Sequence, residues 1–306
     1  MLGQGSRLAL STLALCLAHD GVCADGSPEP TTGDPSSPQT RMEASVRPLP
    51  WLGETCSTTS LPRLSGGWIF GCSSDGRPDR ALQVANGEQH RFAYPEGDWG
   101  ISNGVVLDLQ RKTAFEPGRD GARLTPISSP LHAPLVSDGQ TVVFSGERGI
   151  ETMLLGGNTR TRLSDSKPAP WYPPAINDHG LFWVELHDGQ EEIHWRPHNT
   201  ESQERFAAGP MPLRHVVGEG DHVAWMSDSA VFLKNLSTAE FQEFPAVVHS
   251  NDSLTLSDGL VCFEALDEHD LDIFCSNGFH LKRPGDQRRP SIWRDWLVFH
   301  EGRQTA

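Results

Sequence analysis

Three histidines of this sequence, His187, His194 and His198, lie close to several carboxylates and could therefore hold a transition metal. Their spacing is seven and then four residues. Side chains of a β-strand alternate between its two faces, so an odd spacing of seven separates the first two histidines. Pro197 interrupts the strand before the third. We therefore expect surface histidines rather than a metal centre.

A second group with chemical potential is the acidic run Asp267–Asp270, which Asp272 follows two residues later. Carboxylate oxygens of this kind bind calcium, but the run lacks the glycine at the sixth position that shapes a calcium-binding hand loop. We expect the run to form the solvated tip of a hairpin.

The chain has no phosphate-binding loop of a known type, because the motifs GxGxxG and GxxxxGKS/T do not occur, and no serine lies in the strand–turn–helix context that a catalytic nucleophile needs. A carbohydrate-active enzyme would need paired carboxylates, whereas the candidates Asp108, Glu185 and Glu264 are single residues far apart in the sequence. The sequence thus predicts no catalytic residue, no cofactor and no metal.

The composition restricts the class of protein. The chain has 306 residues, with 25 Lys and Arg against 40 Asp and Glu, a formal net charge of −15. A nucleic-acid partner is excluded because phosphate binding needs clustered basic residues. The 30 glycines and 23 prolines indicate a protein with many turns and short elements.

The first 24 residues are typical of an export signal, with Arg7 before the eleven-residue apolar stretch Leu8–Ala18. Small residues ending at Ala24 predict cleavage before Asp25. A lipoprotein anchored through Cys16 or Cys23 is the less favoured alternative. No later apolar run is long enough to span a membrane, and residues 25–47, rich in Pro, Ser and Thr, should form a disordered linker.

Four cysteines follow the signal, which permits two disulfides in an exported protein. Of the three possible pairings, the repeat described next favours Cys262–Cys275 and Cys56–Cys72. Buried free thiols are the alternative.

Residues 48–306 carry an internal repeat whose anchor is a short apolar segment, a turn rich in Gly, Asp, Asn or Ser, and a bulky apolar strand. Successive anchors are 35 to 41 residues apart, and each repeat divides into four strand-like pieces. The seven anchors begin at Leu64, Ile101, Val136, Ile176, Val217, Leu256 and Ile292. Four antiparallel strands at this period predict an all-β fold, a β-propeller.

Seven blades are expected, although the last repeat contains only its first two strands. An open final sheet would expose an apolar edge, so residues 44–56 should complete it and both termini should close the ring. Six blades is the alternative.

A binding surface is expected where loops reach the faces of the ring. Trp51, Trp99 and Trp171 lie near repeat boundaries, unlike tryptophans on the second strands, whose position favours packing between blades. The basic residues expected beside them are Arg288, Arg289 and Arg294.

The last repeat, Asp272–Glu301, reads DIFCSNGFHLKRPGDQRRPSIWRDWLVFHE and resembles the repeats of TolB-type periplasmic propellers. An Asp-Ile-aromatic strand, an Ile-Trp lead-in and a Val-aromatic strand carry this resemblance. It covers the propeller only, without the N-terminal domain of TolB. It implies the fold, an exported location and a tendency to bind proteins.

Together these observations predict an exported, non-enzymatic propeller, periplasmic or secreted, that acts as a recognition or scaffold module. We expect a monomer whose partner is an envelope protein or a glycan. The alternative is a carbohydrate-active propeller, a polysaccharide lyase or glycoside hydrolase, with its site in the central funnel.

Overall fold

The structure is a computed structural model of the full chain, and it gives only the backbone of the first two strands. The residues that it describes are 10–17, 44–48, 63–72, 78–91, 99–102, 104–108, 113–115, 117, 125–126, 135–138, 140–146, 149–155, 159–164, 172–208, 213–248 and 254–302. Residues 73–77 and the other stretches between these ranges lie outside the description.

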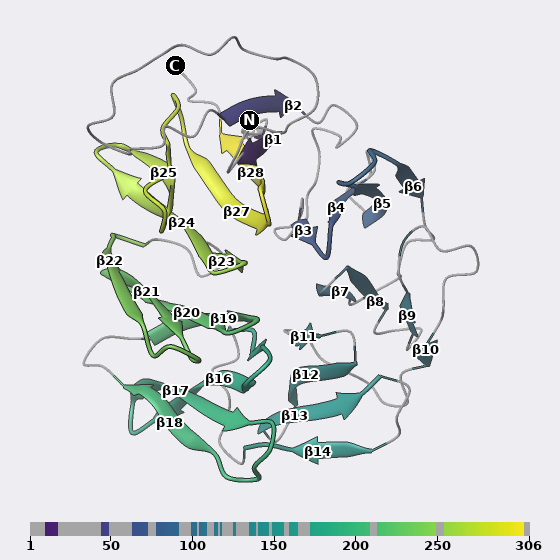
Figure 1. Ribbon diagram of the computed structural model, residues 1–306, viewed down its shortest axis with the longest axis vertical. Coiled ribbons are helices and arrows are strands. Elements are labelled where there is room, and N and C mark those ends of the chain that lie inside the picture. Colours follow the sequence, from purple (N-terminus) through teal and green to yellow (C-terminus); the bar gives the residue numbers. More distant parts are fainter. Residues whose placement is uncertain are drawn as a thin grey trace, which may run out of the picture.

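Within these residues, all regular structure is β, and the strands form seven antiparallel four-stranded sheets around a common centre (Figure 1). The strands of blades 1 to 3 are β3 (Arg63–Ser65), β4 (Trp68–Cys72), β5 (Pro78–Gln83) and β6 (Gln89–Arg91); β7 (Trp99–Ser102), β8 (Val105–Asp108), β9 (Thr113–Phe115) and β10 (Thr125–Pro126); and β11 (Leu135–Ser137), β12 (Thr141–Gly146), β13 (Gly149–Leu154) and β14 (Arg160–Arg162).

Blades 4 to 6 follow in the same order, and blade 7 combines both ends of the chain. Their strands are β15 (Ala175–Ile176), β16 (Gly180–His187), β17 (Gln190–Pro197) and β18 (Glu204–Ala208); β19 (Leu213–Glu219), β20 (His222–Ser227), β21 (Ala230–Asn235) and β22 (Phe241–Pro245); β23 (Leu254–Ser257), β24 (Leu260–Asp267), β25 (Asp270–Cys275) and β26 (His280–Leu281); and β27 (Gln287–Trp293), β28 (Trp296–Gly302), β1 (Leu10–Leu17) and β2 (Ala44–Pro48).

The β-propeller predicted from the repeat is confirmed, and each of the seven anchors lies in the innermost strand of its blade. Turns rich in Gly, Asn and Asp allow the tight hairpin that follows each inner strand. Among the described ranges, no helix is long and apolar enough to cross a membrane.

Blade 7 closes the ring differently from the expectation. Ala44–Pro48 does contribute its outer strand, but the neighbour of β28 is β1, with Leu10 opposite Gly302 and Cys16 opposite Trp296. The sequence assigned Leu10–Leu17 to the export signal and residues 44–47 to the linker. An apolar run of this length satisfies the requirements of a buried strand as well as those of a signal, so the pattern alone does not separate them. Residues 49–56 lie outside the described residues.

The core lies between adjacent blades rather than inside one sheet. Phe182 and Val184 of blade 4 pack against Val223 and Trp225 of blade 5. Trp183 faces the opposite interface and is fully buried. Burial of both faces explains why the second strand of each blade is a continuous apolar run.

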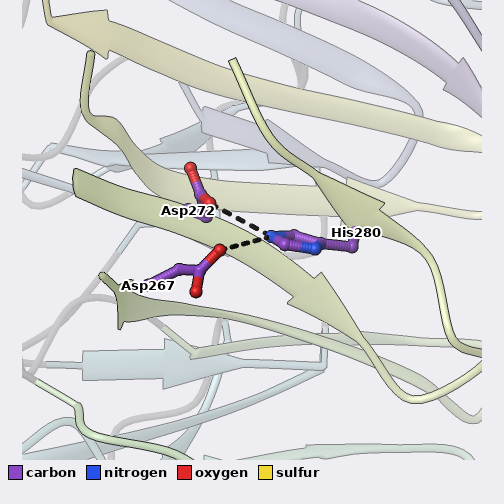
Figure 2. Close-up of side chains that lie close together, drawn as sticks. All are labelled: Asp267, Asp272 and His280. Carbon is purple, nitrogen blue, oxygen red and sulfur yellow. Dashed lines mark hydrogen bonds and ion pairs between the residues drawn. The ribbon is translucent and has the colours of Figure 1, made fainter. Parts of the chain in front are cut away.

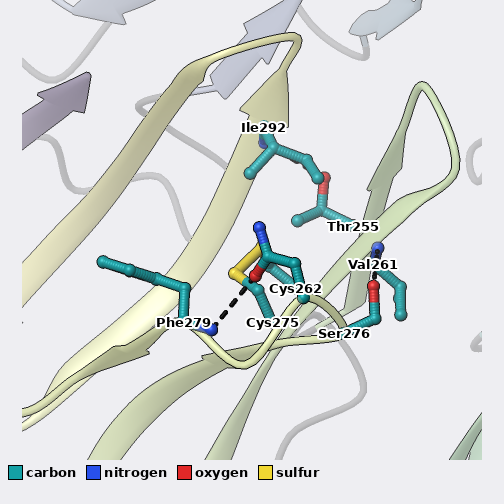
Figure 3. Close-up of a disulfide and its surroundings, with 8 residues drawn as sticks. Thr255, Val261, Cys262, Cys275, Ser276, Phe279 and Ile292 are labelled. Atoms are coloured by element: carbon teal, nitrogen blue, oxygen red, sulfur yellow. Dashed lines mark hydrogen bonds between the residues drawn. A yellow bond between two sulfur atoms is a disulfide. The ribbon is translucent and has the colours of Figure 1, made fainter. Parts of the chain in front are cut away.

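One predicted disulfide is confirmed: Cys262 of β24 is bonded to Cys275, its direct partner on β25 (Figure 3). Hydrogen bonds continue around it, since Cys275 N–H donates to Phe279 O at 2.8 Å and Val261 N–H to Ser276 Oγ at 3.2 Å. Cys56 lies outside the described residues, as does the side chain of Cys72, so their pairing stays a prediction.

Polar contacts connect the hairpins of neighbouring blades at the end of the ring where each inner strand turns outward. A residue at the end of one inner strand, or directly after it, forms a hydrogen bond with the inner strand, the hairpin or the start of the second strand of the next blade, and we name these contacts junction clasps. In the described part of the chain they are Ser65–Gly104, Ser102–Ser137, Asn177–His222, Glu219–Asp258 and Ser257–Arg294. They place the hairpins of these blades at one common end of the ring.

Candidate functional site

The inner strands surround a central cavity of about 800 Å³. Its wall combines polar residues with aliphatic ones. Representative residues from six inner strands are Ser65, Ser137, Ile176, Val217, Leu256 and Ile292. A cavity of this size falls within the range of roughly 300–1,000 Å³ that is usual for ligand sites in proteins.

The cavity has two ends of different character, because all inner strands run in the same direction. We call the end at the hairpins the hairpin mouth and the end at which the inner strands begin the strand-start mouth. The hairpin mouth is acidic: Asp138, Asp178 and Glu219 belong to the cavity wall, and the first two are exposed.

Glu219 is the most constrained of these acids. Burial raises the pKa of its carboxyl group above the ordinary value, and the charges of Asp258 and Asp178 raise it further. Hydrogen bonds from Asp258 N–H and the Ser257 hydroxyl act in the opposite direction. A positive group entering this mouth would therefore find acceptors that are already held in place.

The strand-start mouth carries two nitrogen-bearing side chains, His215 of β19 and Arg289 of β27, and both belong to the cavity wall. Each sits at a β-bulge with a positive φ, 36° for His215 and 54° for Arg289. A positive φ is unusual for residues other than glycine, so the surrounding structure must impose it. Bulges in two blades thus shape this end of the cavity.

Arg289 is held from behind by a buried acid. Its backbone N–H donates to Glu264 Oε2 at 2.9 Å, and Glu264 is only 2% exposed. Burial raises the pKa of Glu264, while this hydrogen bond and the charges of Arg288 and Arg289 lower it. The bulge and the acid together fix the backbone from which the guanidinium projects.

The structure separates the three arginines that the sequence grouped. Arg289 lines the cavity, and the neighbouring Arg288 is exposed and pairs with Asp286 at 2.6 Å. Arg294 lies at the other end of β27, in the hairpin, where its guanidinium lies 4.6 Å from the ring centre of Trp293.

The structure does not describe the side chains of the three tryptophans that were predicted to form a binding surface. Trp99 belongs to inner strand β7, but its side chain lies outside the description. Trp51 and Trp171 are outside the described residues altogether. Their part in a binding surface stays a prediction.

Of the carboxylates considered for a carbohydrate-active enzyme, the two whose side chains the structure describes, Glu185 and Glu264, do not belong to the cavity wall. Glu185 is buried between blades 3 and 4, where it accepts hydrogen bonds from Trp183 Nε1 at 2.6 Å and from the Ser164 hydroxyl. Glu264 lies between blades 6 and 7, and the side chain of Asp108 lies outside the description. These contacts give Glu185 and Glu264 roles in joining blades.

The three histidines from the sequence occupy three separate environments. His187 is exposed and lies 3.5 Å from Asp188. His194 is largely buried between Glu185 and Glu192, at 3.6 Å and 3.3 Å. His198 Nε2 lies 2.8 Å from the backbone oxygen of Asn177 at the cavity wall.

His215 and Glu219 were not singled out by the sequence. His215 occupies the same bulge position in β19 as Arg289 in β27, and only the pairing register reveals that equivalence. Glu219 is the last residue of inner strand β19. The repeat predicted only a turn at this position and gave no sign of a role in a binding site.

The fold and cavity define a β-propeller with a central site. No known family model matches this chain, and no curated protein matches it. Among solved structures, human WBSCR16 is similar over 97% of this chain and 100% of its own, at 11% identity and a TM-score of 0.57.

Two TolB proteins are also among the similar structures. The putative TolB of Agrobacterium tumefaciens is 10% identical, with 97% of this chain and 99% of that chain covered and a TM-score of 0.47. TolB of Acinetobacter baumannii is 14% identical, with 96% and 65% covered and a TM-score of 0.44. TolB proteins, whose repeats the sequence resembles, are therefore present among the similar solved structures. At these identities the similarities concern the fold alone.

Proposed function

We propose that this protein is an exported recognition module that binds a segment of a partner protein in its central cavity. The observation that carries the proposal is the cavity itself, about 800 Å³ in volume, with acids at one mouth and Arg289 and His215 at the other. No chemistry on the partner is part of this proposal.

The wall of the cavity favours a peptide over a glycan. Aliphatic residues such as Val217, Leu256 and Ile292 form its apolar part, and Trp293 is the one Trp, Phe or Tyr among the described residues of the wall. Sugar rings bind best to aromatic faces, whereas aliphatic walls with interspersed hydroxyls and carboxylates suit a peptide with mixed side chains.

The experiment compares Arg289→Asn with Arg294→Asn in the tagged full-length protein. Both residues have positive φ, which Asn tolerates, and both changes remove one positive charge, but only Arg289 lines the cavity. The partner should be recovered from envelope extract by the parent and by Arg294→Asn, and lost with Arg289→Asn.

Equal recovery by both variants would place binding outside the cavity and contradict the proposal. Turnover in a polysaccharide screen would instead favour the carbohydrate-active alternative. Sedimentation of the purified protein tests the further expectation that it is a monomer.

Export to the periplasm or the medium is supported by the disulfide Cys262–Cys275, because such bonds persist in oxidising compartments. We propose cleavage before Asp25, which N-terminal sequencing of the exported protein tests. Cleavage there would remove β1 and leave β28 at a sheet edge, for which Ala44–Pro48 is the available strand. Protection of residues 44–48 from hydrogen exchange in the exported form would support that repairing, and rapid exchange would contradict it.

A further inference from the structure

A cluster of potential metal ligands lies in blade 6, away from the central cavity. Asp267 of β24, Asp272 of β25 and His280 of β26 each direct one ligand atom to a common point, with all three atoms within 4.8 Å of one another (Figure 2). His280 Nε2 is 3.1 Å from Asp272 Oδ2 and 3.8 Å from Asp267 Oδ2. Three consecutive strands of blade 6 thus bring these side chains together.

Asp272 is the unusual member of this cluster. It was expected beside a solvated hairpin tip, and the tip does form at Glu268 and His269, but Asp272 is only 1% exposed. Its Oδ1 is buried and has no hydrogen-bond partner. A buried carboxylate with an unpaired oxygen is costly unless a cation compensates it.

The imidazole of His280 is already oriented for ligation. Its ring stacks on Phe274, with the ring centres 4.1 Å apart and the planes inclined by 19°. This contact fixes the plane in which Nε2 points toward both carboxylates. Preorganisation of this kind lowers the cost of forming a metal site.

The separations suit a transition metal. With bonds of about 2.0–2.2 Å, two ligands on one ion lie roughly 3–4.4 Å apart, which covers both measured distances. One imidazole nitrogen with two carboxylate oxygens matches Zn²⁺ and similar ions, whereas Ca²⁺ prefers six or more oxygens. Three protein ligands would leave a further position on the ion for water.

Lys282 forms an ion pair with one carboxylate of the cluster, Asp267. Lys282 Nζ lies 2.6 Å from Asp267 Oδ2, the oxygen that faces His280, and 4.0 Å from a Glu268 oxygen. Its side chain is 53% exposed, so it can move into solvent without breaking a buried contact. Lys282 and a divalent cation would compete for the same oxygen.

We propose that Asp267, Asp272 and His280 form a binding site for a divalent transition metal of the Zn²⁺ class, and that Lys282 occupies part of it in the metal-free protein. The neutral imidazole binds through Nε2 after its remaining proton moves to Nδ1. The ion replaces the ammonium group at Asp267 and compensates the buried charge of Asp272. With the disulfide between β24 and β25, it would tie three strands of blade 6 together.

The test measures Zn²⁺ affinity of the full-length protein by calorimetry, with Co²⁺ absorption as a second readout of ligand type. Lys282→Met should bind one Zn²⁺ per chain about tenfold more tightly than the parent, because a competing positive charge is gone. His280→Gln and Asp272→Asn should each weaken binding about 100-fold, with loss of the Co²⁺ spectrum.

His187→Gln is the matched control, because His187 also pairs with an aspartate near a hairpin tip but belongs to no group of three potential ligands among the described residues. It should leave the affinity unchanged. His280 is partly exposed, so its variant should fold even if Asp272→Asn does not. Absence of stoichiometric Zn²⁺ in Lys282→Met, or parental affinity in His280→Gln, would overturn the proposal.

Discussion

Ser102 and Ser137, in the inner strands of neighbouring blades, are joined by two hydrogen bonds that share one hydroxyl group. Ser102 Oγ donates to Ser137 O at 2.7 Å and accepts from Ser137 N–H at 2.8 Å. Both residues are buried. The side chain thereby satisfies backbone groups that the sheet of blade 3 leaves open, and it fixes the distance between two blades.

Removal of this hydroxyl should destabilise the protein. Ser102→Ala leaves both backbone groups of Ser137 without this partner, so we expect a loss of about 1–3 kcal/mol in the free energy of unfolding. Urea unfolding measures it, and Ser202→Ala, at an exposed position, serves as control. An equal, negligible effect for both variants would show that the junction clasp does not contribute to stability.

Gly259 and Gly189 offer a comparison between two glycines with nearly the same backbone. Their φ values are +78° and +79°, but a Cβ on Gly259 would lie 2.8 Å from His222 Cε1, whereas one on Gly189 would meet nothing within 4 Å. Both alanine variants should lose about 1–2 kcal/mol from the positive φ. Gly259→Ala should lose about 1–3 kcal/mol more from overpacking.

Unfolding free energies of the two variants give that difference directly. The Gly259→Ala change should cost only about as much free energy of unfolding as Gly189→Ala when it is made in a His222→Ala background, because the ring that the new Cβ would meet is gone. Identical losses for Gly259→Ala and Gly189→Ala would mean that the His222 ring moves away at no cost.

The disulfide of blade 6 closes a short loop, since its cysteines are 13 residues apart. Cys262→Ala/Cys275→Ala should therefore lower the free energy of unfolding by about 3 kcal/mol. The measurement is the urea midpoint under oxidising conditions. Adding reductant to the double variant shows how much the other cysteines contribute to its stability. If the double variant under oxidising conditions has the same urea midpoint as the parent, the prediction is wrong.

The sequence predicted the architecture well because its signals are local. Each anchor holds an inner strand, a hairpin and the start of a second strand within about ten residues, and turn residues mark the hairpin. The Cys262–Cys275 bond followed from the same register, since it joins directly opposed residues of adjacent strands.

The site could be predicted only in part, because it depends on contacts between blades. Ser102 and Glu219 carried the signal of ordinary turn residues, and only the closed ring brings them to the next blade. Arg289 was grouped with Arg294 by proximity in sequence, whereas Arg289 lies near the start of β27 and lines the cavity, and Arg294 follows the end of β27 and is not part of the cavity wall. The burial of Asp272 escaped prediction because a polar residue near a hairpin tip is usually solvated.

Glu264 should make stability depend on pH in a direction opposite to that of a salt-bridged acid. Burial raises the pKa of this carboxyl above its ordinary value of 4.5, so the folded state retains a proton that the unfolded state has already lost. The stabilisation is fully present below the ordinary value, and it disappears as the pH rises through the raised value of the folded state.

Glu264→Gln removes this titration and keeps an oxygen that can accept from Arg289 N–H. We expect the variant to be more stable than the parent at pH 8 and of similar stability at pH 4, as measured by urea unfolding across that interval. The exposed Glu243→Gln is the control and should follow the parent at every pH. A constant loss in Glu264→Gln at both ends of the interval would mean that the negative charge is needed to hold the bulge at Arg289, and that burial does not govern the ionisation of Glu264.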